Sequence, residues 1–187
     1  MERNGKRNES KSGWEETDTS NSMKISKNFS LGEVCKSDAA TRGGWENHPN
    51  EDELVSIVTL IIQCIQPLRD HMDRPIRVNS CFRNLETNRA IGSGDGSAHR
   101  AQNGFAAMDF EIMWFDNKEL AKEIVSFLPS WSDLILEFYD EKIKDPIKRA
   151  DSGWIHLSYN RFGNNPKKVR RALRKNKKVV YEPWNLE

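Results

Sequence analysis

The pattern of hydrophobic positions predicts one long helix in the first half of the chain. Apolar residues recur every three or four positions across residues 54–68, which is typical of a helix with one buried face. Asn50 and Glu53 have the spacing of an N-terminal capping box just before this stretch. Pro67 lacks a backbone N–H, so we expect it to kink or end the regular part, with the last turn reaching about Met72. This helix is predicted to belong to the core.

Shorter patterns predict a second helix and four strands. Residues 117–128 form an amphipathic stretch that begins with the capping residues Asp116 and Glu119. Runs that alternate, or are rich in β-branched residues, predict strands at residues 76–82, 105–114, 134–140 and 153–160. The stretches 41–50 and 86–104 are polar and rich in glycine, and both are predicted to be irregular. Two helices and four strands in this mixed order favour an α+β fold with a mostly antiparallel sheet.

The two ends of the chain differ in composition from the middle. Residues 1–22 are polar, lack periodicity and are predicted to be disordered. Residues 161–178 hold nine Lys or Arg and no acid, whereas residues 1–160 carry 20 basic and 26 acidic side chains. The formal net charge of +1 is therefore a cancellation between an acidic body and a basic segment. We expect a disordered segment at 1–22, a folded domain at 23–162 and a basic extension at 163–187.

The basic extension has two interpretations. Val169 and Leu173 lie at a helical spacing among cations, which predicts a solvated helix packed through a thin apolar stripe. Alternatively, the cations attach the protein to a polyanion, namely a cell-wall polymer, outer-membrane phosphates or nucleic acid. The segment lacks the interleaved aromatic residues of single-strand binders, and we expect no nucleic-acid partner.

Other features argue against whole classes of protein. The longest apolar run, around residues 57–65, is far shorter than the roughly 20 residues of a membrane-spanning helix. The N-terminal residues contain no apolar stretch of a secretory signal. Cys35, Cys64 and Cys81 are widely spaced and form no CxxC pair, so they predict neither a disulfide framework nor a thiolate zinc site. We expect all three thiols to be reduced.

Four polar residues in apolar or glycine-rich surroundings predict a shared site. Asp109, Glu137 and His156 each lie between two apolar neighbours in a different predicted strand, and His99 lies in the long loop. A buried carboxylate or imidazole is destabilising unless it is paired, hydrogen-bonded or bound to a metal. Two imidazoles and one carboxylate can be the three protein ligands of catalytic zinc, which leaves a fourth position for water. A further carboxylate would exchange protons with that water and a leaving amine, and Glu137 is the candidate.

Three short motifs around these residues resemble one enzyme family. They are Ser97-x-His99, Ala107-x-Asp109 and Trp154-Ile-His156, within the segments NSCFRNLETNRAIGSGDGSAHRAQNGFAAMDFEI, LILEFYD and GWIHLSYN. As a set they are similar to the zinc D-alanyl-D-alanine carboxypeptidase family, which includes peptidoglycan-cleaving phage endolysins. The resemblance extends over about residues 24–162, the expected zinc peptidase domain.

The resemblance implies a fold, a cofactor and a set of roles. The fold is the D-Ala-D-Ala carboxypeptidase or hedgehog-like fold, with helices packed on one side of a small sheet and a zinc site on the sheet. The ligands of Zn²⁺ would be His99, Asp109 and His156. Arg83 would bind the substrate or the developing oxyanion through its forked guanidinium, and Ser97 would bind substrate beside the first ligand. The implied reaction is hydrolysis of peptidoglycan stem peptides, at D-Ala-D-Ala as a carboxypeptidase or at L-Ala-D-Glu as an endopeptidase.

Two departures from the family pattern leave alternatives open. His99 and Asp109 are ten residues apart, more than is usual, so the intervening loop is longer. Gly153 occupies the position, three residues before the last histidine, at which many members carry a carboxylate. The base would then be Glu137 or Asp151, and we favour Glu137 because phage-associated members carry a comparable glutamate in an L-I-x-E-F run. The departures also permit an alternative function, a non-catalytic virion or tail structural protein that retains the peptidase fold.

The expected location follows from two conflicting features. A peptidoglycan hydrolase must reach the cell wall, whereas the N-terminal residues do not resemble an export signal. A phage lytic enzyme released through a membrane lesion, or a component carried in a virion, resolves this conflict. We therefore expect a phage-associated monomer, located in the host cytoplasm before its release to the wall or in the virion.

Overall fold

A six-stranded sheet organises the fold. The computed structural model describes residues 23–186, and the segment 1–22, predicted to be disordered, lies outside them. The strands are β1 (Ile76–Ser80), β2 (Phe105–Ile112), β3 (Asp133–Glu137), β4 (Trp154–Asn160), β5 (Lys168–Lys175) and β6 (Lys178–Pro183). They lie in the order β1-β2-β4-β3-β5-β6, in which β3 and β5 are parallel and the other neighbours are antiparallel. The predicted α+β fold with a mostly antiparallel sheet is confirmed.

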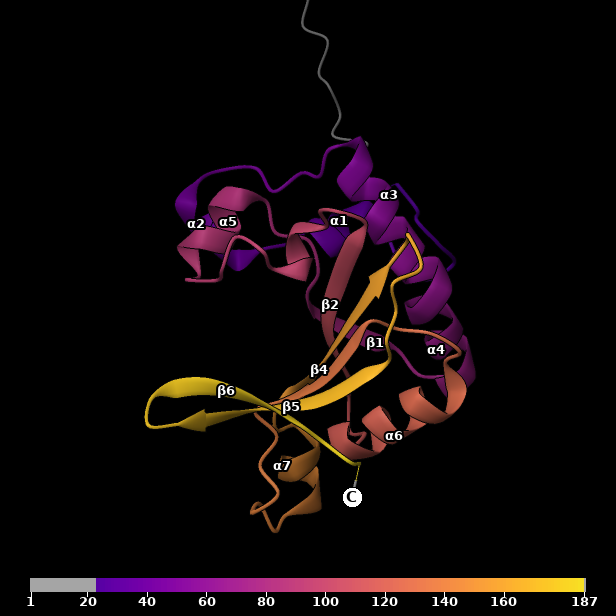
Figure 1. The fold of residues 1–187 in the computed structure, drawn as a ribbon, viewed down its shortest axis with the longest axis vertical. Coiled ribbons are helices and arrows are strands. Elements are labelled where there is room, and N and C mark those ends of the chain that lie inside the picture. Colours follow the sequence, from indigo (N-terminus) through magenta and orange to yellow (C-terminus); the bar gives the residue numbers. More distant parts are fainter. Residues whose placement is uncertain (1–22, 187) are drawn as a thin grey trace, which may run out of the picture.

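Helices α3, α4 and α6 lie along one face of this sheet (Figure 1). The α-helices are α1 (Leu31–Cys35), α2 (Asp38–Gly43), α3 (Glu51–Leu60), α4 (Gln66–Met72), α5 (Leu85–Ala90), α6 (Asn117–Phe127) and α7 (Pro146–Ala150). A π-helical turn, η2 (Ile61–Ile65), joins α3 to α4, and a 3₁₀ turn, η3 (Ala98–Arg100), precedes β2. Among residues 23–186, none of the helices has the length and apolar character needed to cross a membrane.

The long helix predicted in the first half of the chain is confirmed, in three joined parts. The Asn50 side chain accepts from the Glu53 N–H (3.0 Å), and the Glu53 side chain accepts from the Asn50 N–H (2.9 Å), which completes the capping box. Pro67 falls in the first turn of α4, directly after the π-helical turn. A π-helical turn changes the backbone hydrogen-bond pattern locally, so the helix can continue although Pro67 has no backbone N–H to donate. The helix then ends at Met72.

Alternation along the central strands separates a buried face of the sheet from an open one. Phe110 on β2, Leu134 on β3 and Ile155 on β4 are fully buried in the hydrophobic core, which α3 and α6 cover. Successive side chains of a strand point to opposite faces, so Asp109 and His156 point away from this core. The helical layer therefore leaves the other face free for a polar site.

Two stretches predicted to be irregular contain short helices, and those predictions are wrong in part. Helix α2 extends into the stretch 41–50, and α5 occupies the beginning of the stretch 86–104. Asn84 caps α5 by accepting from the Thr87 N–H (2.8 Å), and the buried residues of α5 are Thr87 and Asn88. Without an apolar face, α5 leaves no hydrophobic period in the sequence. The predictions of α6 and of β1 to β4 are confirmed.

The helix predicted in the basic extension is wrong, because residues 168–183 form the antiparallel hairpin of β5 and β6. The four-residue spacing of Val169 and Leu173 fits a strand as well as a helix, since four is a multiple of the two-residue strand period. Asn176 (φ 50) and Lys177 (φ 63) form the two-residue turn between the strands. Because β5 pairs with β3, the basic extension enlarges the sheet.

A buried asparagine joins three segments that border the open face. The Asn47 amide donates to the carbonyls of Cys35 (2.8 Å) and Phe82 (2.9 Å), and its oxygen accepts from the Asn84 N–H (2.8 Å). Phe82 and Asn84 flank Arg83 in the chain. Asn47 therefore holds the turn from which the Arg83 side chain projects.

Replacing Asn47 by alanine is expected to lower the free energy of unfolding by about 3 kcal/mol, because two carbonyls and one N–H lose their buried partner. Urea denaturation measures this change. Asn185→Ala, at an exposed position, is the matched control and is expected to change stability by less than about 0.5 kcal/mol. An Asn47→Ala protein as stable as the control would contradict the bracing role.

Candidate metal centre

Three side chains that could hold a metal ion meet on the open face of the sheet. Asp109 on β2 lies directly opposite His156 on β4 in the antiparallel register, and η3 carries His99 to the same place. Asp109 Oδ1 lies 2.8 Å from His156 Nδ1 and 3.2 Å from His99 Nε2. The two imidazole nitrogens are 3.3 Å apart. His99 and Asp109 are buried, and His156 is partly buried.

The geometry of this cluster fits a tetrahedral zinc ion. Ligand bonds of about 2.0–2.2 Å at tetrahedral angles separate neighbouring ligand atoms by roughly 3.3–3.6 Å. Two of the three distances within the cluster, 3.2 and 3.3 Å, are close to this range, whereas the 2.8 Å between Asp109 and His156 is that of a direct hydrogen bond. His99 Nδ1 donates to the Cys81 carbonyl (2.7 Å), which fixes the ring and leaves Nε2 directed at Asp109 and His156. Three protein ligands of this kind leave a fourth coordination position free for a substrate or water.

The loop between His99 and Asp109 absorbs its extra length close to the first histidine. Ser97 accepts from the His99 N–H (3.3 Å) and caps η3, and the Arg83 N–H donates to the His99 carbonyl (2.9 Å). Three of the four residues 101–104 have a positive φ, which produces a tight reversal before β2 begins. The longer spacing therefore leaves both side chains in reach of each other.

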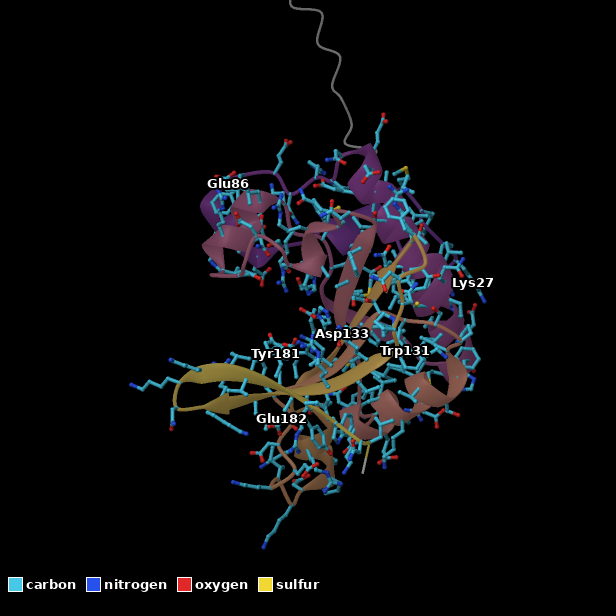
Figure 2. The ribbon with its side chains drawn as sticks, in the orientation of Figure 1. Lys27, Glu86, Trp131, Asp133, Tyr181 and Glu182 are labelled. Atoms are coloured by element: carbon cyan, nitrogen blue, oxygen red, sulfur yellow. The ribbon has the colours of Figure 1, made fainter. Side chains whose placement is uncertain are left out.

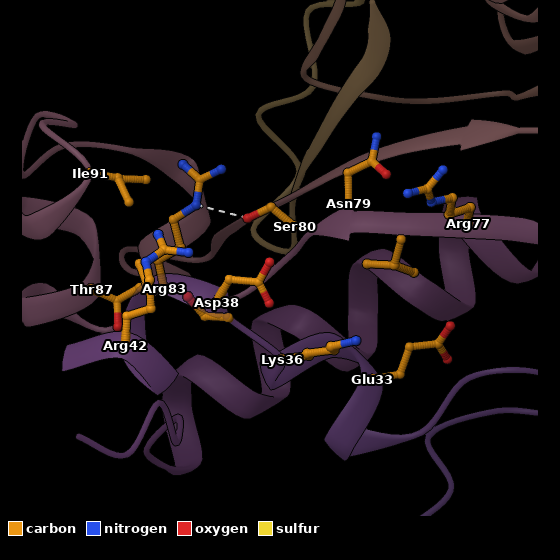
Figure 3. A pocket seen from close by; sticks show the side chains of 13 residues that line it. Glu33, Lys36, Asp38, Arg42, Arg77, Asn79, Ser80, Arg83, Thr87 and Ile91 are labelled. Carbon is orange, nitrogen blue, oxygen red and sulfur yellow. Dashed lines mark hydrogen bonds between the residues drawn. The ribbon is translucent and has the colours of Figure 1, made fainter. Parts of the chain in front are cut away.

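Arg83 binds the outer oxygen of the Asp109 carboxylate. Its Nη2 donates to Asp109 Oδ2 (2.9 Å), and its Nε donates to Ser80 Oγ (2.8 Å). Figure 3 shows the contact with Ser80 at the edge of a polar cavity of about 440 Å³, which Arg83 also lines. The remaining nitrogen, Nη1, makes no hydrogen bond within the part of the chain that the structure describes. Arg83 thus orients the carboxylate and keeps one donor for a ligand.

Opposite charges set the protonation states in the cluster. Burial alone would raise the pKa of Asp109, but His99 and His156 outweigh it and hold that pKa well below its usual range. Burial lowers the pKa of His99, which favours a neutral ring. Burial also acts to lower the pKa of His156, but its hydrogen bond with Asp109 and the charge of Asp109 raise that pKa overall. The ionised carboxylate and the neutral imidazole are the states that bind a metal ion.

The cluster lies in a cleft with a volume of about 1020 Å³. Residues 93–98 line one wall, and the β5–β6 hairpin lines the other, across the open space on the left of Figure 2. Glu137 on β3 lines the same cleft, and burial together with the charge of Asp109 raises its pKa. Asp151, the other candidate base, follows α7 and is not among the residues that line the cleft.

The backbone leaves no room for a side chain at position 153. A Cβ at Gly153 would lie 2.1 Å from the Glu137 carbonyl oxygen and 2.7 Å from the Tyr139 nitrogen. Gly153 also has a φ of 66°, which L side chains rarely adopt. The position at which the resembling family often carries a carboxylate is therefore closed, and the carboxylate of Glu137 reaches the cleft from the adjoining strand.

Two cleft residues, Asp133 on β3 and Tyr181 on β6, have no counterpart in the sequence predictions. Lys168 and Arg170 on β5 are predicted only as cations of the basic extension, and Ser158 on β4 shares the face of His156, as strand alternation predicts. The β-branched and aromatic run of β6, KVVYEP, is a strand signal that could have indicated the hairpin. Its place beside the cleft depends on the pairing of β5 with β3, which the sequence pattern does not reveal.

Chelator-treated protein is expected to gain thermal stability when zinc is added, because the ion binds the folded cluster. With free zinc at 100 times Kd, the gain in unfolding free energy is about 2.7 kcal/mol. His99→Ala and His156→Ala are expected to lose this zinc-dependent rise in Tm, whereas His48→Ala, at an exposed position outside the cluster, keeps it. A full rise in the His99→Ala protein would rule out this ligand set.

The segment that contains the first two candidate ligands matches a known family. The family model described as Peptidase M15 matches residues 27–129, which is more than half of the chain and includes Arg83, His99 and Asp109. No curated protein and no solved structure matches the chain. The family match confirms the resemblance that the sequence motifs indicated, and with it the predicted dependence on zinc. The chain belongs to the Peptidase M15 family of zinc-dependent metallopeptidases.

Proposed function

We propose that the protein cleaves peptidoglycan stem peptides, either at D-Ala-D-Ala as a carboxypeptidase or at L-Ala-D-Glu as an endopeptidase. One observation carries the proposal: the His–Asp–His cluster and the carboxylate of Glu137 line one cleft. The motifs that the chain shares with wall-cutting enzymes favour stem peptides as the substrate. The cleft volume of about 1020 Å³ is sufficient for several residues of an extended peptide.

The candidate site residues of the cleft have separate tasks in this reaction. His99, Asp109 and His156 would hold the ion, and zinc, when bound, would lower the pKa of a water ligand to about 7 and polarise a peptide carbonyl. The Glu137 carboxylate accepts a proton from the attacking water and returns it to the leaving amine.

Arg83 and Ser97 position the candidate metal ligands and bind the substrate. Nη2 of Arg83 holds Asp109 Oδ2, so that Oδ1 stays directed at the two imidazoles. Its Nη1 donates to a substrate oxygen or to the oxyanion that forms during hydrolysis. Ser97 lines the cleft and caps the turn that carries His99, so it both positions a ligand and contacts substrate.

We also propose a phage-associated setting, on the strength of the motifs shared with phage endolysins. The protein then remains in the host cytoplasm until it is released to the cell wall, or it is carried in the virion. It acts as a monomer, and the exposed cations of the β5–β6 hairpin contact polyanionic wall polymers.

Zinc-loaded wild-type protein is expected to cleave purified sacculi, and mass spectrometry of all products, including free D-alanine, identifies the bond that is cut. Glu137→Gln is expected to reduce the rate about 10²- to 10⁴-fold, because the group that transfers the proton is lost. This variant should keep its zinc, which metal analysis checks. Asp151→Asn is the matched control: it removes the carboxylate outside the cleft and is expected to cleave at the wild-type rate.

The alternative function, a non-catalytic virion or tail protein, has a different outcome in the same assay. It predicts no cleavage by the wild-type protein, with or without bound zinc. Undiminished cleavage by His156→Ala or by metal-free protein would instead refute the zinc mechanism. If Glu137→Gln cleaved sacculi at the wild-type rate and Asp151→Asn cleaved them slowly, the base would be Asp151 and not Glu137.

A further inference from the structure

The β5–β6 hairpin extends the cleft-facing surface of the sheet two strands beyond Glu137. In the strand register, Glu137 on β3 lies opposite Ala172 on β5, and Ala172 lies opposite Tyr181 on β6. Paired residues of neighbouring strands project from the same face, so Tyr181 faces the cleft and lines it. Figure 2 shows Tyr181 on the cleft side of the hairpin and Glu182 on the other side. Two strand spacings separate the backbones of Glu137 and Tyr181 by roughly 10 Å.

The residue between them has a small side chain, which is itself fully buried. Ala172 contributes a single methyl group, so no large side chain in the row separates the Glu137 carboxylate from the Tyr181 ring. Partial burial and the charge of Glu137 both raise the pKa of Tyr181, in keeping with two side chains that face one space. The phenol therefore stays protonated at neutral pH and can donate a hydrogen bond.

The Tyr181 ring is held in place and yet accessible. The Arg170 guanidinium lies 5.2 Å from the centre of the ring, and Asp133 Oδ1 in turn accepts from Arg170 Nε (2.9 Å). Even so, 48% of Tyr181 is exposed, and its hydroxyl has no hydrogen-bond partner among residues 23–186. A preorganised aromatic side chain with an unused donor loses little entropy on binding a ligand.

Lys168 is a second donor on the same wall of the cleft. It lies on β5 two positions before Arg170, so both side chains point to one face, and both line the cleft. Arg170 is paired with Asp133 and Arg83 with Asp109. Lys168 is exposed and has no ion-pair partner in the described part of the chain. An ammonium group and a phenolic hydroxyl together suit a ligand with oxygen acceptors.

We infer that Tyr181 and Lys168 form a substrate-binding subsite that takes the oxygen acceptors of the peptide on the Glu137 side of the scissile bond. The acceptors are peptide carbonyl oxygens or a carboxylate. Arg170 is a positioning residue, because it acts through the Tyr181 ring. The subsite rests on the proposed function, since it requires a peptide bound across the metal centre. The Peptidase M15 match ends at residue 129 and therefore does not extend to this hairpin.

Steady-state kinetics of the zinc-loaded protein on a synthetic stem pentapeptide test the role of Tyr181. Tyr181→Phe keeps the ring and removes the hydroxyl, so KM is expected to rise about 5-fold while kcat stays within about twofold of the wild-type value. Val179→Ala is the matched control, because Val179 is an exposed residue of the same hairpin that does not line the cleft. This control is expected to leave both constants unchanged.

The contribution of Lys168 distinguishes the two kinds of acceptor. Lys168→Ala is expected to raise KM about 10-fold for the pentapeptide with free carboxylates. If the acceptor is a carboxylate, the same substitution raises KM less than about twofold for a pentapeptide whose carboxylates are amidated. An equal rise with both peptides identifies a carbonyl oxygen as the acceptor. Either result supports the subsite.

Binding is measured separately, so that a failure of the subsite can be told from a failure of the proposed function. In the Glu137→Gln protein, which is expected to bind the pentapeptide without cleaving it, adding Tyr181→Phe should raise the calorimetric Kd about 5-fold. Unchanged KM and Kd in the Tyr181→Phe and Lys168→Ala proteins, with an active wild-type protein, overturn the subsite alone. No cleavage by the zinc-loaded wild-type protein overturns both.

Discussion

The buried carboxylate of Asp109 is the constraint on which the site depends. An ionised carboxylate removed from water is strongly destabilising unless charges and donors surround it. Arg83 donates to one of its oxygens, and the imidazoles of His99 and His156 face the other. The pairing of β2 with β4 sets Asp109 opposite His156. A slip of one residue would turn one of these side chains into the hydrophobic core, so the packing of the sheet keeps the candidate metal centre together.

The same requirement accounts for polar contacts at some distance from the cluster. Arg83 reaches Asp109 from the turn after β1, and the buried amide of Asn47 holds the backbone on both sides of Arg83. His99 reaches the cluster from the turn that Ser97 caps, and its carbonyl accepts from the Arg83 N–H. Backbone contacts thus connect the residue that balances the charge of Asp109 to the turn that carries the candidate ligand His99. A loss of either turn would leave the carboxylate buried with too few partners.

Local sequence patterns predicted the elements that bury apolar side chains. They did not predict the elements that bury polar residues or that depend on long-range strand pairing. The helix around residues 54–68, α6 and β1 to β4 have a clear hydrophobic period because each packs on the core. Helix α5 has no such period, since the residues that it buries are the polar Thr87 and Asn88. Their positions between apolar neighbours in strands indicated that Asp109 and Glu137 belong to a site. The hydrophobic period does not show that the two residues line the same cleft. The β5–β6 hairpin escaped prediction because a four-residue spacing is ambiguous and its pairing with β3 is a long-range parallel contact.

The order of the strands separates the chemistry of the cleft from its binding wall. From β2 outward through β4 and β3, the open face presents Asp109, His156 and Glu137 in turn, and the hairpin then presents Lys168 and Tyr181. None of the three cluster residues lies on the hairpin. Its surface residues can therefore change without altering the ion or the carboxylate beside it, provided that the pairing of β5 with β3 is kept. With the proposed subsite on the hairpin, substrate preference can vary at the outer strands while the proposed hydrolytic centre stays fixed on the inner ones.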